Sequence, residues 1–172
     1  MRIRQATSAD SVLIAEIYNH YVKNSHSTFE IEPIDSTEMR RRMMDGRAAG
    51  YPFLVIEDDL EVVGYAYGRR FRPRFAYLYS IEVSVYVKNG KEGRNIGSLL
   101  YDRLLKDIRQ MDFHAVIGGI SLPNEASVRL HEKFGFQKVA HFRQVGRKFD
   151  RWIDVGYWEL LLDHEIGTIR DP

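Results

Sequence analysis

One stretch near the middle of the chain has the clearest alternation of apolar and polar positions. The odd positions from Tyr77 to Val87 are all apolar, whereas the even positions include Ser80, Glu82 and Ser84. A period of two predicts a β-strand from Tyr77 to Val87 with one face in a hydrophobic core. The other face of this strand carries a carboxylate, Glu82, in the middle of an otherwise apolar segment.

The pattern changes to a helical one after this strand. Apolar residues recur at helical spacing from Ile96 to Ile108, with charged residues between them. The connecting segment, residues 88–95, contains two glycines, three basic residues and Asn95. Free backbone N–H groups and the positive end of the helix dipole converge at such a helix start. The stretch therefore predicts a site for a phosphate group.

The remaining pattern predicts six further strands and three further helices. The strands are expected at residues 3–6, 53–57, 61–71, 115–121, 137–142 and 154–162, and a polar loop is expected at 144–152. The helices are expected after Asp10 through Tyr21, at 36–49 and at 124–134. This order predicts an α/β (α+β) chain with one mixed sheet and helices on both faces.

Composition limits the possible functions. With 172 residues, 44% of them hydrophobic, we expect a single domain over residues 1–163 and a peripheral tail at 164–172. There is no cysteine, so thiolate nucleophiles, disulfides and cysteine-based zinc sites are excluded. The histidines show no metal-ligand spacing, and we assign no metal.

Charge and hydropathy give no reason to expect a nucleic-acid or membrane partner. The formal net charge is +1, and no basic and aromatic stacking motif accompanies the two arginine runs. The N-terminus has no apolar signal region, and no stretch is long enough to span a membrane. We therefore expect a cytoplasmic protein.

A specific motif occupies residues 123–136, which read Pro-Asn-Glu-Ala-Ser-Val-Arg-Leu-His-Glu-Lys-Phe-Gly-Phe. This segment resembles the pattern Asn-x-x-Ala/Ser-x-x-Leu-Tyr-Glu-Lys-x-Gly-Phe of the GNAT N-acetyltransferases. His131 stands at the generic Tyr, as in the phosphinothricin and methionine sulfoximine acetyltransferase branch. Residues 27–33, 82–87 and 146–155 also resemble segments of that branch.

The loop before residue 96 resembles the acyl-CoA pyrophosphate loop of the same family, Gln/Arg-x-x-Gly-x-Gly/Ala. Aligned on Gly97, the chain has Asn95 at the first Gly and Glu92 at the Gln/Arg position. Asn tolerates a left-handed backbone, so Asn95 can keep the turn. Glu92 departs from the pattern, and beside a pyrophosphate we expect its side chain to point to solvent.

The resemblance implies a GNAT fold with a mostly antiparallel sheet. It also implies acetyl transfer from acetyl-CoA to the primary amine of a small amino acid analogue by direct attack in a ternary complex. Glu82 would take a proton from the ammonium, whose pKa is about 8. His131 would protonate the leaving thiolate or act as a second base, since its ordinary pKa is about 6.5. A backbone N–H near Val83 to Val85 would stabilise the oxyanion.

The resemblance also assigns binding residues. The residues expected to contact acetyl-CoA are Val85, Val87, Arg94, Asn95, Ile96, Gly97, Ser98, Asn124 and Ser127. The residues expected to contact the amine substrate are Thr28, Phe29, Arg74 and Tyr77. Arg74 is placed on the substrate carboxylate because a guanidinium can bind it with two parallel hydrogen bonds.

Structural interpretations of the same residues stay open. A lone Glu in a strand is more often a surface residue, His131 on a helix is more often a packing residue, and Asn124 is explained by helix capping alone. Two other functions are also open: acetylation of a peptide or protein N-terminus, and a non-catalytic acyl-CoA sensor. A nucleic-acid binder is the weakest alternative. Homodimers are common in the branch, and the apolar final strand could support one.

Overall fold

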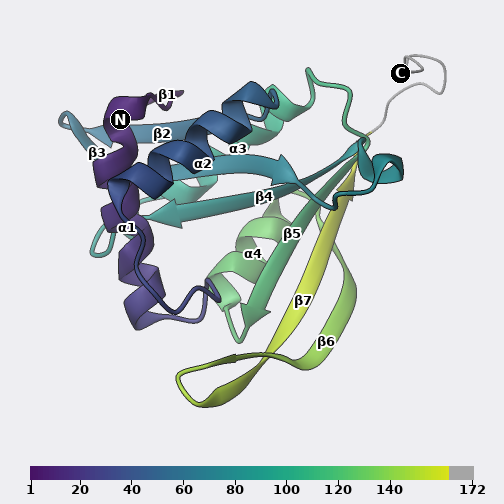
Figure 1. Ribbon diagram of the computed structural model, residues 1–172. Helices are drawn as coiled ribbons and strands as arrows, with labels where there is room; N and C mark the ends of the chain where they lie inside the picture. Colours follow the sequence, from purple (N-terminus) through teal and green to yellow (C-terminus); the bar gives the residue numbers. More distant parts are fainter. Residues whose placement is uncertain (163–172) are drawn as a thin grey trace.

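The alternating segments of the chain build one seven-stranded sheet, which the computed structural model describes within residues 1–162. Its strand order is β1-β2-β3-β4-β5-β7-β6, and only β4 and β5 run parallel (Figure 1). The strands are β1 (Arg2–Gln5), β2 (Phe53–Asp58), β3 (Glu61–Arg70), β4 (Ser80–Val87), β5 (Ala115–Leu122), β6 (Gln137–Lys148) and β7 (Arg151–Leu161). The mixed, mostly antiparallel sheet is as predicted.

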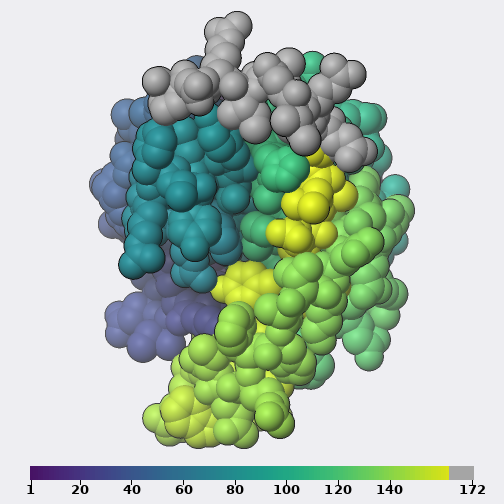
Figure 2. All heavy atoms as spheres, turned by 90° about the vertical axis from the view of Figure 1, so that its right-hand side faces the viewer, coloured from purple at the N-terminus to yellow at the C-terminus, as the bar shows by residue number. Residues whose placement is uncertain are grey.

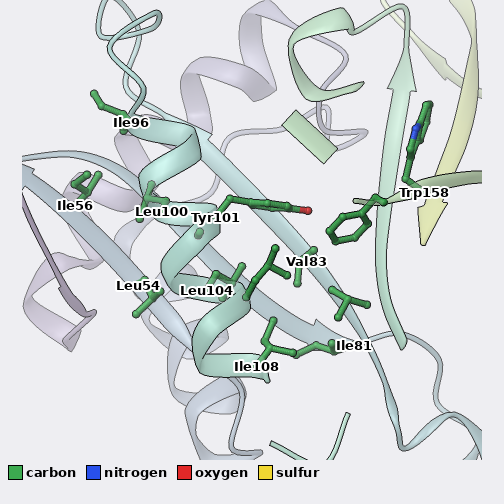
Figure 3. Close-up of a cluster of buried hydrophobic side chains, with 14 of the residues drawn as sticks. Leu54, Ile56, Ile81, Val83, Ile96, Leu100, Tyr101, Leu104, Ile108 and Trp158 are labelled. Atoms are coloured by element: carbon green, nitrogen blue, oxygen red, sulfur yellow. The ribbon is translucent and has the colours of Figure 1, made fainter. Parts of the chain in front are cut away.

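Helices cover both faces of the sheet, as the sequence predicts (Figure 1). They are α1 (Ser11–Asn24), α2 (Ser36–Ala48), α3 (Ile96–Ile108) and α4 (Glu125–Lys133), with short 3-10 turns at Ser8–Asp10 and Phe75–Tyr77. The apolar stripe of α3 packs on β2 and β4, where Leu100 and Leu104 are fully buried beside Leu54 and Ile81 (Figure 3). Helices α1 and α2 pack on the opposite face.

The centre of the sheet is split. β4 pairs with β5 only from Ser80 to Glu82, opposite Ala115 to Ile117. β3 remains paired with β4 as far as Val87, and β7 remains paired with β5 as far as Leu122. Among residues 1–162, no strand pairs with β4 on its β5 side beyond Glu82. Backbone groups on that edge are therefore available for a ligand.

Two predicted boundaries were wrong. The central strand begins at Ser80 rather than Tyr77, because Phe75–Tyr77 form a 3-10 turn to which no neighbouring strand extends. The predicted polar loop at 144–152 is mostly the end of a β6–β7 hairpin, with a turn at Phe149 and Asp150, both at positive φ. Its side chains are largely exposed, so no alternation with a core marks it as strand. The tail predicted at 164–172 lies outside the described residues.

Candidate active site

A cavity of about 640 Å³ occupies the split between β4 and β5. Its walls come from residues 83–87 of β4, residues 119–121 of β5, the start of α3 and the inner face of α4. Such a cavity offers backbone hydrogen-bond groups along one side and a helix N-terminus at one end. That combination suits an extended ligand with an anionic group.

The loop from β4 to α3 is shaped by three residues with left-handed backbone. Gly90, Gly93 and Asn95 have φ of 81°, 77° and 62°, and Asn95 is the N-cap of α3. Asn95 thus keeps the turn that the family pattern gives to glycine. The backbone N–H groups of Ile96, Gly97 and Ser98 lie in the first turn of α3, where no intrahelical partner is available.

The charged side chains around this helix start differ from the expected set. The exposed Glu92 carboxylate accepts a hydrogen bond from the Gly90 N–H at 2.7 Å. Arg94 lies 3.8 Å from Asp58 in an exposed ion pair, and its side chain does not line the cavity. Lys133 lines it instead, and its Nζ donates to Ser98 Oγ at 3.1 Å.

Sequence reasoning missed Lys133 as a cation for the phosphate. It belongs to the Leu-His-Glu-Lys part of the matched motif, but the pattern alone does not show that α4 brings it to the start of α3. Lys91 and Arg129 also line the cavity. The helix N–H groups and these cations together fit a pyrophosphate, although the exposed Glu92 carboxylate lines the same cavity.

Glu82 projects from β4 onto the α1/α2 side of the sheet and forms an ion pair that the sequence did not predict. Arg69 stands directly opposite it on β3, and its Nε and Nη2 donate to the two Glu82 oxygens at 3.1 and 3.0 Å. The Glu82 side chain is 17% exposed and that of Arg69 is 57% exposed. Glu82 Oε1 also lies beside Gly119, which lines the cavity.

His131 is buried beneath β5, where its ring packs against Tyr101 and Phe136. Its Nδ1 lies 2.7 Å from the Ser127 carbonyl, so Nδ1 carries the proton and Nε2 has a lone pair. Burial lowers the pKa of His131, with the Ser127 bond opposing this, and the ring is therefore neutral at pH 7.

Glu82 and His131 lie on opposite faces of the sheet. A Cβ on Gly118 would lie 2.2 Å from His131 Nε2, whereas a Cβ on Gly119 would lie 3.5 Å from Glu82 Oε1. Successive residues of a strand point to opposite faces. The structure thus does not bring these two side chains together, although both border the split in the sheet.

The other residues predicted to contact acetyl-CoA also line the cavity, but some of their polar groups already have hydrogen-bond partners within the protein. Val85 and Val87 lie on the open edge of β4, but the Val87 carbonyl accepts the Tyr21 hydroxyl at 2.6 Å. Asn124 is the N-cap of α4, with its side chain accepting from the Ser127 N–H at 3.1 Å. The structural role considered for Asn124 is therefore present.

The predicted substrate residues separate into two groups. Thr28 and Phe29 belong to the α1–α2 connection, which the β6–β7 hairpin holds: Lys148 Nζ donates to the Thr28 carbonyl at 2.8 Å, and the Phe29 ring lies on Gly146. Arg74 and Tyr77 lie at the exposed end of the β3–β4 connection. The Arg74 guanidinium makes no hydrogen bond or ion pair with any residue that the structure describes, and its assignment stays a prediction.

The fold and the cavity together define an α/β acyltransferase with a groove for an acyl-CoA. Residues 3–156 match the acetyltransferase (GNAT) domain family. The chain belongs to the GNAT acetyltransferases; it is an N-acetyltransferase whose acetyl donor is acetyl-CoA.

Two curated relatives cover nearly the whole chain. A phosphinothricin N-acetyltransferase of Streptomyces coelicolor is 40% identical, over 92% of this chain and 95% of its own. An L-methionine sulfoximine/L-methionine sulfone acetyltransferase of Salmonella typhimurium is 38% identical, over 95% of each chain. The chain is similar to both.

Two solved structures share the fold at comparable identity. A phosphinothricin acetyltransferase from Sinorhizobium meliloti, in complex with acetyl-CoA, has a TM-score of 0.92 and 32% identity, over 99% of this chain and 92% of its own. A ribosomal-protein-alanine N-acetyltransferase from Brucella melitensis has a TM-score of 0.93 and 35% identity, over 94% and 100%.

Within residues 1–162, no group of three or more His, Asp or Glu side chains is placed to hold a metal ion. In the same range, every helix is too short or too polar to cross a membrane.

Proposed function

We propose that this acetyltransferase acts on the primary amine of a small amino acid analogue, such as phosphinothricin, methionine sulfoximine or methionine sulfone, by direct attack in a ternary complex. The observation that carries the proposal is the position of Glu82. Its carboxylate lies beside Gly119 at the acetyl-CoA groove and borders the α1/α2 side of the sheet, from which an amine can approach. The activities for which the two curated relatives are named support the substrate class.

Glu82 is assigned as the base. An α-ammonium must lose a proton before its nitrogen can attack, and a carboxylate within reach can accept that proton directly or through water. Bound acetyl-CoA supplies the acetyl group, so that a C–N bond forms as the C–S bond breaks and the thiol leaves. The backbone edge of β4 from Val83 to Val85, which β5 does not pair, would donate a hydrogen bond to the developing oxyanion.

His131 is assigned as a hydrogen-bond acceptor rather than an acid. Its only proton at neutral pH is on Nδ1 and is directed at the Ser127 carbonyl. Because burial lowers the pKa of the ring, His131 Nε2 does not hold a proton ready for the thiolate. We therefore favour direct protonation of the thiolate by solvent in the groove.

Peptide acetylation is the second candidate, and the similarity to the ribosomal-protein-alanine N-acetyltransferase from Brucella melitensis favours it. The α1–α2 connection argues for a smaller substrate, because it crosses the end of the groove. His26 Nδ1 lies 3.0 Å from Ser121 Oγ, and Asn124 Nδ2 lies 3.4 Å from Ser27 Oγ. These contacts narrow the approach that an extended peptide would need.

We further propose a homodimer, which the family resemblance and the apolar final strand suggest, and a cytoplasmic location.

The test is thiol release from acetyl-CoA with phosphinothricin, methionine sulfoximine, methionine sulfone, ordinary amino acids and a short peptide. We expect turnover of at least one of the first three. Glu82→Gln should lower kcat/KM for it by roughly 10²–10⁴-fold below the pH at which the amine deprotonates unaided.

Glu57→Gln is the matched control, because Glu57 is also a strand carboxylate that is 17% exposed and paired with an arginine, Arg4. It should leave kcat/KM unchanged. Turnover of the peptide, with no turnover of the amino acids or their analogues, would support peptide acetylation instead. Binding of acetyl-CoA without turnover of any amine in the panel would reject the proposed substrate class.

A further inference from the structure

The Arg69–Glu82 ion pair occupies the proposed base. Both Glu82 oxygens accept hydrogen bonds from one guanidinium, with the side chains side by side on paired strands. Each oxygen keeps a second lone pair that can accept a substrate ammonium, but the guanidinium already balances the charge of the carboxylate. Removing the guanidinium without replacement would leave it without a counter-ion. A substrate with both an ammonium and a carboxylate would therefore keep Glu82 and Arg69 each paired with an opposite charge.

A second cavity, of about 450 Å³, begins at Arg69 on the α1/α2 side of the sheet. Much of its wall is aromatic: Phe53, Tyr65 and Tyr67 stack on one another with ring centroids 5.0–6.1 Å apart. Met39 from α2 and Tyr18 from α1 contribute the opposite side. A wall of this kind suits an apolar or aromatic side chain.

The charges that line this second cavity are distributed unevenly. Arg42 is held by two carboxylates, at 2.6 Å from Glu30 and 2.7 Å from Glu38. Asp45 pairs with Arg41 at 2.7 Å. In the part of the chain that the structure describes, Arg69 has Glu82 as its only ion-pair partner. Arg69 is therefore the lining cation best able to take a new anion.

We propose that Arg69 binds the carboxylate of an α-amino acid substrate while Glu82 receives its ammonium, and that the second cavity takes the side chain. This rests on the proposed function of Glu82. The zwitterion replaces the Arg69–Glu82 pair charge for charge, so neither protein group is left unpaired. The exchange also places the amine at the carboxylate that lies beside the acetyl-CoA groove.

The cavity selects among amino acids. Glu30 and Asp45 line it, so the anionic phosphinate of phosphinothricin would meet carboxylates there, and among the proposed substrates the inference favours methionine sulfone and methionine sulfoximine. A neutral side chain of the size of methionine, methionine sulfone or phenylalanine avoids this cost and packs on the aromatic wall. The carboxylate is thus assigned to Arg69 in place of Arg74, which is exposed and lines neither cavity.

The experiment compares each amino acid with its decarboxylated amine: phenylalanine with 2-phenylethylamine, and methionine sulfone with 3-(methylsulfonyl)propylamine. Arg69→Gln should raise KM for the amino acids by roughly 10–100-fold, as expected for hydrogen bonds to a charged group. It should change KM for the amines by less than about threefold. Arg69→Lys should recover part of the loss, and Arg74→Gln should change neither.

Two kinetic outcomes would overturn the assignment. An equal loss for acids and amines in Arg69→Gln would mean that Arg69 only orients Glu82. A loss selective for acids in Arg74→Gln alone would return the carboxylate to Arg74.

Calorimetric titration of phenylalanine into the parent and Arg69→Gln, each with CoA present, separates this inference from the proposed function. If phenylalanine binds the parent, binds Arg69→Gln more weakly and is turned over by no variant, the Arg69 contact with the carboxylate is supported. Acetyl transfer to this substrate is then rejected. Neither binding nor turnover of any of the amino acids would reject the inference. If Glu82→Gln turns over the amines at the parent rate, Glu82 is rejected as the base. The contact between Arg69 and the substrate carboxylate is not rejected by that result.

Discussion

Gly118 and Gly119 show how far single residues define this site. They are neighbours on β5, yet Gly118 faces His131 and Gly119 faces Glu82 and Tyr157. Neither has a positive φ, so the requirement for glycine comes from space rather than from backbone conformation. A side chain at 118 would displace the buried imidazole, whereas a methyl at 119 meets only ordinary contact distances.

We predict that Gly118→Ala and Gly119→Ala have different consequences. Gly118→Ala should lower the free energy of unfolding by roughly 1–3 kcal/mol, because its Cβ would lie 2.2 Å from His131 Nε2. Gly119→Ala should change it little but reduce kcat/KM, because the methyl lies beside Glu82 in the groove. Urea denaturation and thiol-release assays of both variants measure this. Equal stability of the two would contradict the His131 contact.

At the scale of elements, the β6–β7 hairpin holds the α1–α2 connection. The end of this hairpin projects beyond the body of the protein next to that connection (Figure 2). Lys148 is only 3% exposed, and its Nζ donates to the Thr28 carbonyl. Burial lowers the pKa of Lys148, with the charge of Glu30 opposing this. The lysine thus fixes the backbone beside Phe29, whose ring rests on Gly146.

Lys148→Met should therefore loosen the substrate side of the site. We expect KM for the amine to rise several-fold and KM for acetyl-CoA to stay unchanged, because the α3 loop does not depend on this contact. Steady-state kinetics with each substrate varied in turn measures this. Lys138→Met, on an exposed position of the same strand, is the control and should change neither constant. A rise in KM for acetyl-CoA would mean that the hairpin supports the groove as well.

At the scale of the whole molecule, the buried carboxylate of Asp10 makes the free energy of unfolding depend on pH. Asp10 is 5% exposed, and both of its oxygens accept hydrogen bonds from Arg4 at 2.8 Å. Arg4 also binds Glu57 at 2.8 Å, which ties β1, β2 and the start of α1 together. The Arg4 hydrogen bonds lower the pKa of Asp10 to about 2, although burial opposes them.

The stability that Asp10 contributes is present above its unfolded pKa, near 3.8, and is lost as the pH falls toward about 2. Asp10→Asn should therefore lower the free energy of unfolding by roughly 2 kcal/mol at pH 7 and by much less at pH 2. Chemical denaturation at the two pH values measures this. Asp45→Asn, in an exposed pair, should have little effect at either pH. A pH-independent difference for Asp10→Asn would reject the linkage.

The sequence by itself determined the elements and the local turns. The alternation along β4, the apolar stripe of α3 and the cap at Asn124 depend on residues close together in the chain, and the structure has all three. Asn95 likewise adopts the left-handed conformation expected from its residue type. The local pattern failed at Tyr77, to which no neighbouring strand extends, and at the β6–β7 hairpin, whose largely exposed side chains show no alternation with a core.

Only the tertiary structure decided which side chains meet. The pairing of Arg69 with Glu82 depends on the register of β3 against β4, and a shift of one residue would separate them. The place of His131 on the opposite face of the sheet from Glu82 depends on how α4 packs beneath Gly118. These contacts join segments that are distant in sequence. Hydrophobic periodicity predicts which face of a segment is buried, but not which residue of another segment packs against that face.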